Sequence, residues 1–526
     1  MTQDADIRRV AQAAAAALAR RDFAAALALG RQWVAMRPLD MGGNQVVGLA
    51  AMETGDLAAA KAHLQRASTA APKDANIHNL LGVALKRSGE LDRARAAFKR
   101  AGELGAGEAW RNLGNLEGEA NDVDAAIGAY RAAVRANDSD AAAHGSLAQM
   151  LERRHALVEA RAHAERAITL NPSNDIARLA LAQVALREKA FAEAEGIALP
   201  LASGASASKT NRALAWGMVG EARDRLDRAH EAFAAFQSAN ALLAELHGRL
   251  LRDSHLPYHP DGVRRMLALL DMPMPRAPTS FPTPPPIFLV GFPRSGTTLL
   301  DQILSSHPRL YCMEEKEIFA ESVGDLLLGD ATLGGLDIEA RRADYWSRVH
   351  EPLGDRLLVD KLPLNIIFLP LIARVFPDAK IIFALRDPRD VILSCFQQRF
   401  GMNAAMAQFL DLGSAAEYYD QVMSLLEACR ARLPLKVHQV RYEDVVANLE
   451  HEARALTAFL DLPFEPSMLG YRETAIARDI NTPSARQVIE PLYNRSIGRW
   501  RRYAADMAPV LPTLNRWAAR YGYDAA

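Results

Sequence analysis

The C-terminal half of the chain contains the stretch Ile287-Phe-Leu-Val-Gly-Phe-Pro-Arg-Ser-Gly-Thr-Thr-Leu-Leu-Asp-Gln-Ile-Leu304. Its first four residues are apolar and typical of a buried parallel strand, and a helix is predicted from about Thr298. The short loop between them brings backbone N–H groups and the helix N-terminus toward one point, where partial positive charge and unsatisfied donors favour an anion. The stretch therefore predicts a phosphate-binding loop.

This loop differs from the loop of nucleoside-triphosphate enzymes in the position of its cation. The spacing of Gly291 and Gly296 matches that motif, but Thr297 stands where the motif requires Lys, and the cation is Arg294 inside the loop. Because those enzymes use the Lys on the transferred phosphoryl group, its loss argues against ATP or GTP. The sequence leaves two alternatives: the segment is a strand-to-helix turn that binds no ligand, or the loop binds another phosphate or sulfate ester.

Length and composition limit the kind of protein. The 526 residues are enough for two or three domains. A net charge of −1 and a charged fraction of 24% point neither to nucleic-acid binding nor to disorder. The alanine-rich run 11–19 is too weakly apolar to span a bilayer, and the three cysteines have neither metal-site spacing nor the number for a disulfide framework. We expect a soluble, unexported protein with reduced cysteines and no metal.

The N-terminal half repeats with a period of 34 residues, except for one step of 32. Such a period predicts a helix–turn–helix unit, and Gly48, Gly82 and Gly114 lie where the first helix of a unit must approach its neighbour closely. An alanine recurs at the same place in each unit. These alanines are Ala26, Ala60, Ala94, Ala126, Ala160 and Ala194.

The pattern resembles the tetratricopeptide repeat, in about six copies with a looser seventh around Gly220, Ala229 and Phe233. Stacked repeats form a solenoid whose concave groove suits an extended peptide. We therefore expect the solenoid to bind a peptide or protein. A solenoid that only stiffens the protein or makes it dimerise is the alternative.

Prolines are frequent between about His255 and Pro286. Proline fixes φ and lacks a backbone donor, so a semi-rigid connector is predicted, with one short helix at Gly262–Leu270. The predicted parts are an all-α solenoid over 1–246, a connector over 247–286 and an α/β domain over 287–526.

Four apolar segments of the last part are predicted strands, and the helical segments between them imply a parallel sheet. They are Ile287–Val290, Leu357–Val359, Lys380–Leu385 and Val437–Val440. Ligand groups collect at the carboxyl ends of parallel strands, so the residues after each strand are site candidates. These are Arg294, Asp360-Lys361, Arg386-Asp387-Pro388-Arg389-Asp390 and Arg441-Tyr442-Glu443-Asp444.

From about Phe288 to Trp500, the order of these motifs resembles a sulfotransferase that uses 3′-phosphoadenylyl sulfate (PAPS), and most closely the protein-tyrosine sulfotransferase branch. The resemblance implies a P-loop-like α/β sulfotransferase domain after the repeat solenoid. It also implies that the loop Pro293–Thr298 binds the 5′-phosphosulfate. The implied contacts are Arg294, Ser295, Gly296, Thr297 and Thr298.

The resemblance implies a catalytic base as well. In that branch the second glutamate of a Cys-Gly-Glu-Glu run is the base, and the corresponding run here ends at Glu315. Met313 replaces the glycine, and Lys316 replaces the usual threonine. Acceptor contacts around the base are therefore expected to differ from those of the branch.

Two further catalytic roles follow from the resemblance. Lys361, in an Asp-Lys-x-Pro turn, is implied to bridge the cofactor and the transferred group. Ser484 lies in a segment that resembles the C-terminal loop over the cofactor and is implied to stabilise the transition state. Arg499 stands where the branch has a phosphate-binding lysine.

The 3′-phosphate site is also implied by resemblance. Arg386 and Ser394 match its arginine and serine, and Tyr442 matches a tyrosine that lines the nucleotide pocket. A further family arginine would fall on Gln398, next to Arg399. One residue along a helix rotates a side chain by about 100°, so the sequence leaves open whether Arg399 takes this role.

The cysteines differ from those of lumenal relatives, in which cysteines pair. Cys312 and Cys429 match one member of each pair, but Val359 and Val437 occupy the partner positions. Both bridges are impossible, and a cytoplasmic location is expected.

The function implied is transfer of the sulfuryl group of PAPS to a hydroxyl acceptor, without a metal and with Glu315 as general base. Tyrosine on a protein or peptide, a glycan and a small alcohol are all candidate acceptors. A P-loop-like kinase and a repeat scaffold with an inactive catalytic domain are the alternative functions.

Overall fold

The computed structural model describes residues 2–272, 281, 283–327, 337–477 and 495–524. The chain forms two compact units, Met1–Ala207 and Ser208–Ala526.

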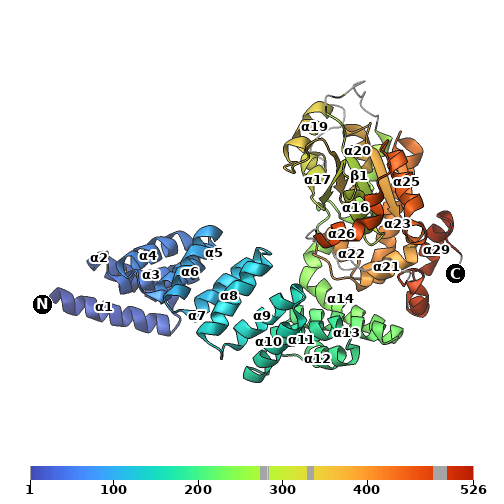
Figure 1. The fold of residues 1–526 in the computed structure, drawn as a ribbon. Helices are drawn as coiled ribbons and strands as arrows, with labels where there is room; N and C mark the ends of the chain where they lie inside the picture. Colours follow the sequence, from blue (N-terminus) through green and yellow to red (C-terminus); the bar gives the residue numbers. More distant parts are fainter. Residues whose placement is uncertain (1, 273–280, 282, 328–336, 478–494, 525–526) are drawn as a thin grey trace. The chain divides into compact units, whose positions relative to one another are not determined.

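The first unit consists of antiparallel helix pairs stacked in chain order (Figure 1). The helices are α1 (Thr2–Ala19), α2 (Phe23–Met36), α3 (Met41–Glu53), α4 (Leu57–Ala70), α5 (Ala75–Arg87), α6 (Leu91–Glu103), α7 (Gly107–Glu119), α8 (Val123–Ala136), α9 (Ala141–Arg153), α10 (Leu157–Leu170), α11 (Asp175–Arg187) and α12 (Phe191–Ser203). Many begin after an Asp or Asn whose side chain accepts a hydrogen bond from a first-turn amide, as Asp56 does before α4. Such a cap stabilises a helix by roughly 1 kcal/mol.

Close packing within each pair depends on the repeated small residues. The six repeat alanines are completely buried. In three pairs a glycine of the first helix contacts the large residue four positions after the alanine: Gly48 with Leu64, Gly82 with Phe98, and Gly114 with Tyr130. A Cβ atom at Gly48 would lie 2.5 Å from the Leu64 side chain, too close for any real contact. The prediction that these glycines mark close helix approach is confirmed.

A further helix pair, α13 (Lys209–Arg225) and α14 (Ala229–Arg252), belongs to the second unit. Here Gly220 contacts Phe236, and the buried alanine is Ala232. The sequence placed the corresponding residues at Ala229 and Phe233, three positions too early. Residues three apart lie on nearly the same helix face, so the local pattern could not distinguish the two registers.

The sheet of the second unit is parallel, with strand order β2-β3-β1-β4-β5. The strands are β1 (Ile287–Gly291), β2 (Leu310–Glu314), β3 (Leu357–Lys361), β4 (Lys380–Leu385) and β5 (Lys436–Arg441). The parallel sheet and four strands were predicted, and they are confirmed. The sequence missed β2, because a short apolar run cannot be assigned to strand or helix by periodicity alone.

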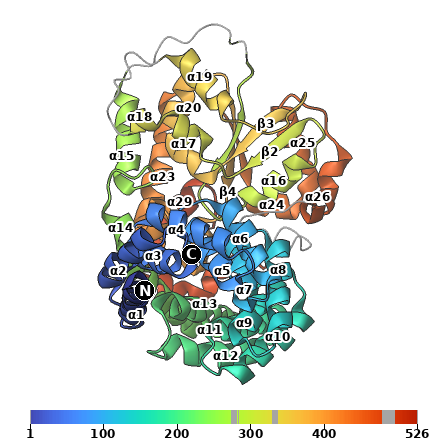
Figure 2. The same ribbon diagram turned by 90° about the vertical axis from the view of Figure 1, so that its left-hand side faces the viewer.

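Helices cover both faces of this sheet. Phe288 and Val290 point into one apolar cluster, while Ile287 and Leu289 point into another. Among the described residues, the other helices of this unit are α15 (Pro260–Ala268), η1 (Leu269–Asp271), α16 (Thr297–Ser305), α17 (Ile318–Ser322), α18 (Gly324–Leu327), α19 (Ile338–Ser347), η3 (Pro363–Phe368), α20 (Leu369–Val375), α21 (Pro388–Gln397), α22 (Ala404–Gln408), α23 (Leu412–Arg432), α24 (Tyr442–Ala447), α25 (Leu449–Phe459), η4 (Pro466–Gly470), α26 (Tyr471–Ala477), η5 (Arg499–Tyr503), α28 (Ala504–Met507) and α29 (Leu511–Arg520). Helices α16, α25 and α26 border the second cluster and α17, α20 and α23 the first (Figure 2).

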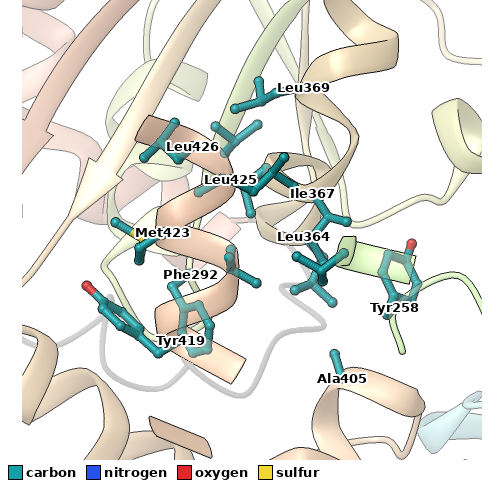
Figure 3. Packing of buried hydrophobic residues seen from close by; sticks show 14 of the residues in the cluster. Tyr258, Phe292, Leu364, Ile367, Leu369, Ala405, Tyr419, Met423, Leu425 and Leu426 are labelled. Carbon is teal, nitrogen blue, oxygen red and sulfur yellow. The ribbon is translucent and has the colours of Figure 1, made fainter. Parts of the chain in front are cut away.

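The first cluster lies beneath the phosphate-loop candidate and joins distant parts of the chain. Phe292, directly after β1, packs edge-on against Tyr419 of α23, with ring centroids 4.8 Å apart (Figure 3). Phe236 of α14 belongs to the same cluster. The helix pair α13–α14 therefore shares a hydrophobic core with the sheet.

Across the described residues, every helix is too short or too polar to cross a bilayer.

Candidate functional site

The predicted phosphate loop connects β1 to α16. A Cβ atom at Gly291 would lie 2.7 Å from the carbonyl oxygen of Ala384 on β4, so only glycine fits there. Gly296, at the N-terminus of α16, has a φ of +96°, and a Cβ there would lie 2.9 Å from the Tyr442 ring. Arg294 also has positive φ, at 71°. A non-glycine residue in this region is strained by roughly 1–3 kcal/mol, a cost that often marks functional sites.

Four predicted cofactor contacts meet around this loop. Arg294 donates from Nε to Ser394 Oγ at 2.9 Å, and its carbonyl oxygen accepts from Arg386 Nη1 at 3.1 Å. The guanidinium of Arg386 lies 5.0 Å from the centre of the Tyr442 ring. Arg386 is only 8% exposed, and its Nε finds no hydrogen-bond partner among the described residues. A buried cation with a spare donor suits an anionic ligand.

The candidate base and the candidate bridging lysine form a pair at the neighbouring strand ends. The Glu315 amide, one residue past β2, donates to the carbonyl oxygen of Lys361 at 2.8 Å. Lys361 Nζ in turn donates to Glu315 Oε1 at 3.0 Å. The Lys361 side chain is completely buried, whereas that of Glu315 is 36% exposed. The Glu315 side chain is therefore paired with a buried lysine and remains accessible from outside.

A buried carboxyl fixes the end of β3 that carries Lys361. Asp360 accepts from the Tyr345 hydroxyl at 2.8 Å and from Asn365 Nδ2 at 3.2 Å. Burial raises the pKa of Asp360 to about 7. The sequence lists Asp360 among the strand-end candidates and assigns it no role. Its hydrogen bonds to Tyr345 and Asn365 indicate that it stabilises the structure here.

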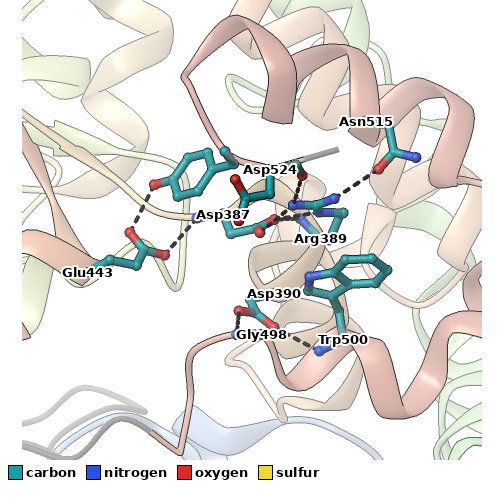
Figure 4. A network of polar contacts seen from close by, with 9 residues as sticks. Asp387, Arg389, Asp390, Glu443, Gly498, Trp500, Asn515 and Asp524 are labelled. Carbon is teal, nitrogen blue, oxygen red and sulfur yellow. Dashed lines mark hydrogen bonds and ion pairs between the residues drawn. The ribbon is translucent and has the colours of Figure 1, made fainter. Parts of the chain in front are cut away.

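The charged segment after β4, which continues into the first turn of α21, divides into two parts. Arg386 faces the phosphate loop, but Arg389 makes a two-pronged pair with Asp387 (2.9 and 2.8 Å) and lies 4.2 Å from the Trp500 ring. Asp390 accepts from the amides of Gly498 at 2.6 Å and Trp500 at 2.8 Å (Figure 4).

The strand-end residue Glu443 has a similar structural role. It accepts from the Asp387 amide at 3.1 Å and from the Tyr523 hydroxyl at 2.9 Å (Figure 4). Of the charged candidates after β4 and β5, Arg386 is thus the one turned toward the phosphate loop in the described contacts.

Two other predicted site residues, Arg499 and Arg399, lie beside α13. Arg499 Nη2 lies 2.8 Å from Asp224 Oδ2 on α13, so a carboxylate already neutralises this proposed phosphate ligand. Arg399 follows the end of α21 and lies beside α13, where a Cβ at Gly217 would be 3.5 Å from its Cδ. Ser484 lies outside the described residues.

Ser295, Thr297 and Thr298 are buried in the loop and the first turn of α16.

Across the described residues, no group of three or more His, Cys, Asp or Glu side chains could hold a metal ion.

Two parts of the chain match models of known protein families. The model described as "Sulfotransferase family" matches residues 285–466, and tetratricopeptide-repeat models match 51–116, 111–175 and 159–209. An uncharacterized protein of Aquifex aeolicus is 30% identical over 255 residues, which make up 44% of this chain and 32% of that protein. The chain thus spans about a third of that relative's length.

Two other known proteins are similar to parts of this chain. Protein-tyrosine sulfotransferase A of Caenorhabditis elegans is 27% identical over 269 residues, 46% of this chain and 68% of that one. The crystal structure of MamA protein is 20% identical and covers 32% of this chain and 92% of its own, with a TM-score of 0.29. Residues 285–466 therefore form a domain of the sulfotransferase family, and tetratricopeptide repeats precede it in the chain.

Proposed function

We propose that this protein transfers the sulfuryl group of PAPS to a hydroxyl acceptor, with Glu315 as general base. The observation that carries the proposal is the pair formed by Glu315 and the buried Lys361, at strand ends on the same edge of the sheet as the phosphate loop. A carboxylate and an ammonium at this edge are what proton abstraction and charge stabilisation require.

The described residues fit the proposed donor. The unpartnered Nε of buried Arg386 and the Tyr442 ring beside it suit a phosphate and a nucleoside respectively. When bound, PAPS would supply the sulfuryl group and a phosphate leaving group. The residues proposed to hold it are Arg294, Ser295, Gly296, Thr297, Thr298, Arg386, Ser394 and Tyr442. For Arg499 the ion pair with Asp224 favours a structural role instead.

Each side chain of the proposed site would have its own catalytic role. Glu315 takes the proton of the acceptor hydroxyl as the hydroxyl oxygen attacks sulfur. For a tyrosine acceptor, the pKa of the free hydroxyl is about 10. A protonated Glu315 attracts Lys361 less strongly, and the ammonium is then available to the developing charge on the leaving phosphate. Arg294 supplies a second cation to the same charge. Ser484 is proposed as a further stabilising donor.

A macromolecular acceptor is the proposal that agrees best with the domain composition. Tetratricopeptide repeats stack into surfaces suited to extended peptides, and several relatives are named protein-tyrosine sulfotransferases. We therefore propose a protein or peptide tyrosine as the acceptor and the repeats as its binding surface. Cys312, Cys395 and Cys429 are all buried. A reducing, cytoplasmic location is proposed because Val359 and Val437 occupy the positions where lumenal relatives have the partner cysteines.

Nucleotide binding and label transfer test this function. Calorimetry should show that adenosine 3′,5′-bisphosphate binds without Mg²⁺ and that ATP does not compete. Incubation with radiolabelled PAPS and a tyrosine-containing peptide or a cell lysate should then label a hydroxyl acceptor. Binding of ATP with Mg²⁺ in place of the bisphosphate would instead identify a kinase. Binding without transfer to any acceptor would identify an inactive catalytic domain.

A further inference from the structure

Helix α13 contributes a buried carboxylate to the C-terminal part of the catalytic unit. Asp224 is 7% exposed. Its Oδ2 accepts from Arg499 Nη2 at 2.8 Å, and its Oδ1 accepts from Arg502 Nη1 at 3.3 Å and from the Tyr503 hydroxyl. The carbonyl oxygen of Asp224 accepts from Arg502 Nη2 at 3.0 Å. One side chain of α13 thus holds three residues of η5.

The segment 496–503 is attached to the donor site at its other end. Arg386 Nη2 donates to the carbonyl oxygen of Ser496 at 2.6 Å, while Nη1 of the same guanidinium donates to the Arg294 carbonyl. The amides of Gly498 and Trp500 are held by Asp390. A continuous series of described contacts therefore runs from Asp224, through 496–503, to the two arginines beside the phosphate loop.

The helix pair that carries Asp224 is packed firmly against the sulfotransferase domain. Phe233 of α14 stacks on Phe396 of α21, with ring centroids 4.9 Å apart. Buried Asn240 donates to the carbonyl oxygen of Phe396 at 2.9 Å. His230, at the exposed rim, pairs with Asp506 at 2.7 Å. These contacts give α13 a fixed place from which Asp224 can act.

We propose that Asp224 is a positioning residue for the donor site: it holds the segment 496–503 so that Arg386 stays beside Arg294 in the geometry that binds phosphate. The last repeat-like helix pair would then serve the catalytic domain rather than recruit an acceptor. The kinetic consequence of this proposal rests on the proposed function. Its structural consequence, the anchoring of 496–503, does not depend on which ligand binds.

The test is Asp224→Asn in the full chain, a change that keeps the size and one acceptor oxygen but removes the charge. Hydrogen exchange of peptides covering 495–503 should become about tenfold faster, as expected when a local anchor is lost. The dissociation constant for adenosine 3′,5′-bisphosphate and the KM for PAPS should rise by a similar factor of about ten, since a misplaced guanidinium loses charge-assisted hydrogen bonds to phosphate. The KM for the acceptor should stay constant.

A matched control is His230→Ala, which removes a pair at the exposed rim of the same interface. It should change neither the exchange of 495–503 nor nucleotide affinity. An equal effect of both variants would overturn the proposal, because it would reflect general loosening of the interface. If Asp224→Asn does not fold, Tyr503→Phe removes one hydrogen bond to the same carboxylate and should show a smaller change of the same sign.

Unchanged exchange in 495–503 in a folded variant would refute the anchoring role. Faster exchange with unchanged nucleotide affinity would refute its link to the donor site. A wild-type protein that binds no bisphosphate would refute the proposed function, and the exchange measurement would still decide whether Asp224 anchors the segment.

Discussion

Arg386 and Arg389, on either side of the start of α21, show how side chains three positions apart can have unrelated roles. Arg386 contacts the phosphate loop and retains an unpartnered donor within the described residues, whereas Arg389 is neutralised by Asp387 and covered by Trp500. A cation already paired with a carboxylate has little to gain from a ligand phosphate, because the ligand must first displace that carboxylate. At this scale, the partner of a charge determines its function.

The substitution Glu315→Gln should lower kcat about a hundredfold or more while leaving bisphosphate affinity unchanged, as expected when a general base is lost. Steady-state rates and calorimetry measure the two quantities. Glu314→Gln, one residue earlier at the end of β2, is the matched control and should keep most of the activity. Full activity of Glu315→Gln would remove Glu315 from the mechanism.

Asp360 should make the stability of the domain depend on pH. Its pKa in the folded protein is raised to about 7 by burial, whereas an unfolded aspartate titrates near pH 4. The folded state therefore binds the proton more tightly, so its contribution to stability is greatest below about pH 4 and is lost as the pH rises to about 7. Each pH unit in this window corresponds to about 1.4 kcal/mol, giving a loss of the order of 4 kcal/mol.

Urea denaturation at several pH values, compared with Asp360→Asn, isolates this effect. The difference in unfolding free energy between the two proteins should change across the window and be flat above it. A difference independent of pH would show that folding leaves the pKa of Asp360 unchanged.

At the scale of elements, the repeats are stabilised by contacts between a glycine and a large side chain of the next helix. Glycine inside a helix is unfavourable by up to about 1 kcal/mol relative to alanine. It is tolerated where the partner helix approaches so closely that a Cβ would clash, as at Gly82 against Phe98. Packing therefore outweighs helix propensity at these positions.

Gly82→Ala should destabilise the pair α5–α6, because the new Cβ would lie 2.6 Å from the Phe98 ring and overpacking costs about 1–3 kcal/mol. Gly128→Ala in α8, where an added Cβ would meet no atom within 4 Å apart from the adjacent residues and the backbone of its own helix, should instead stabilise α7–α8 by up to about 1 kcal/mol. Hydrogen exchange resolved by helix measures both variants. Equal signs for the two changes would contradict this account.

At the scale of the whole molecule, the two compact units meet in the sequence at Ala207 and Ser208, ahead of the proline-rich stretch. Ala232 and Phe236 contribute to the core of the sulfotransferase domain, so a deletion that reaches about Leu250 would expose that core. A functional truncation should begin at Ser208.

The fragment 208–526 should fold, bind bisphosphate like the full chain and sulfate a small acceptor at the same rate. Its KM for a macromolecular acceptor should rise if the removed repeats present that acceptor, because an intramolecular encounter becomes bimolecular. Circular dichroism and steady-state kinetics on the two acceptors provide the comparison. An unchanged KM on the macromolecular acceptor would eliminate recruitment by residues 1–207.

Features that contiguous residues encode could be predicted from the amino-acid sequence. The strand, loop and helix of 287–304 follow from local hydrophobicity and glycine placement, and the repeats follow from a period of 34 residues. The order of charged strand ends was also sufficient to place Arg294, Lys361 and Arg386 on one edge of a parallel sheet, because all strands of such a sheet end there.

Which charges are paired, and which helices belong to which core, depends on how the elements pack together in space. Asp224 and Arg499 are 275 positions apart, and no local pattern relates them. The same holds for Asp390 and the amides of Gly498 and Trp500. Ion pairs and hydrogen bonds depend on distances of a few ångströms between elements, which packing of the whole domain sets, whereas periodicity reports only the face that an element buries.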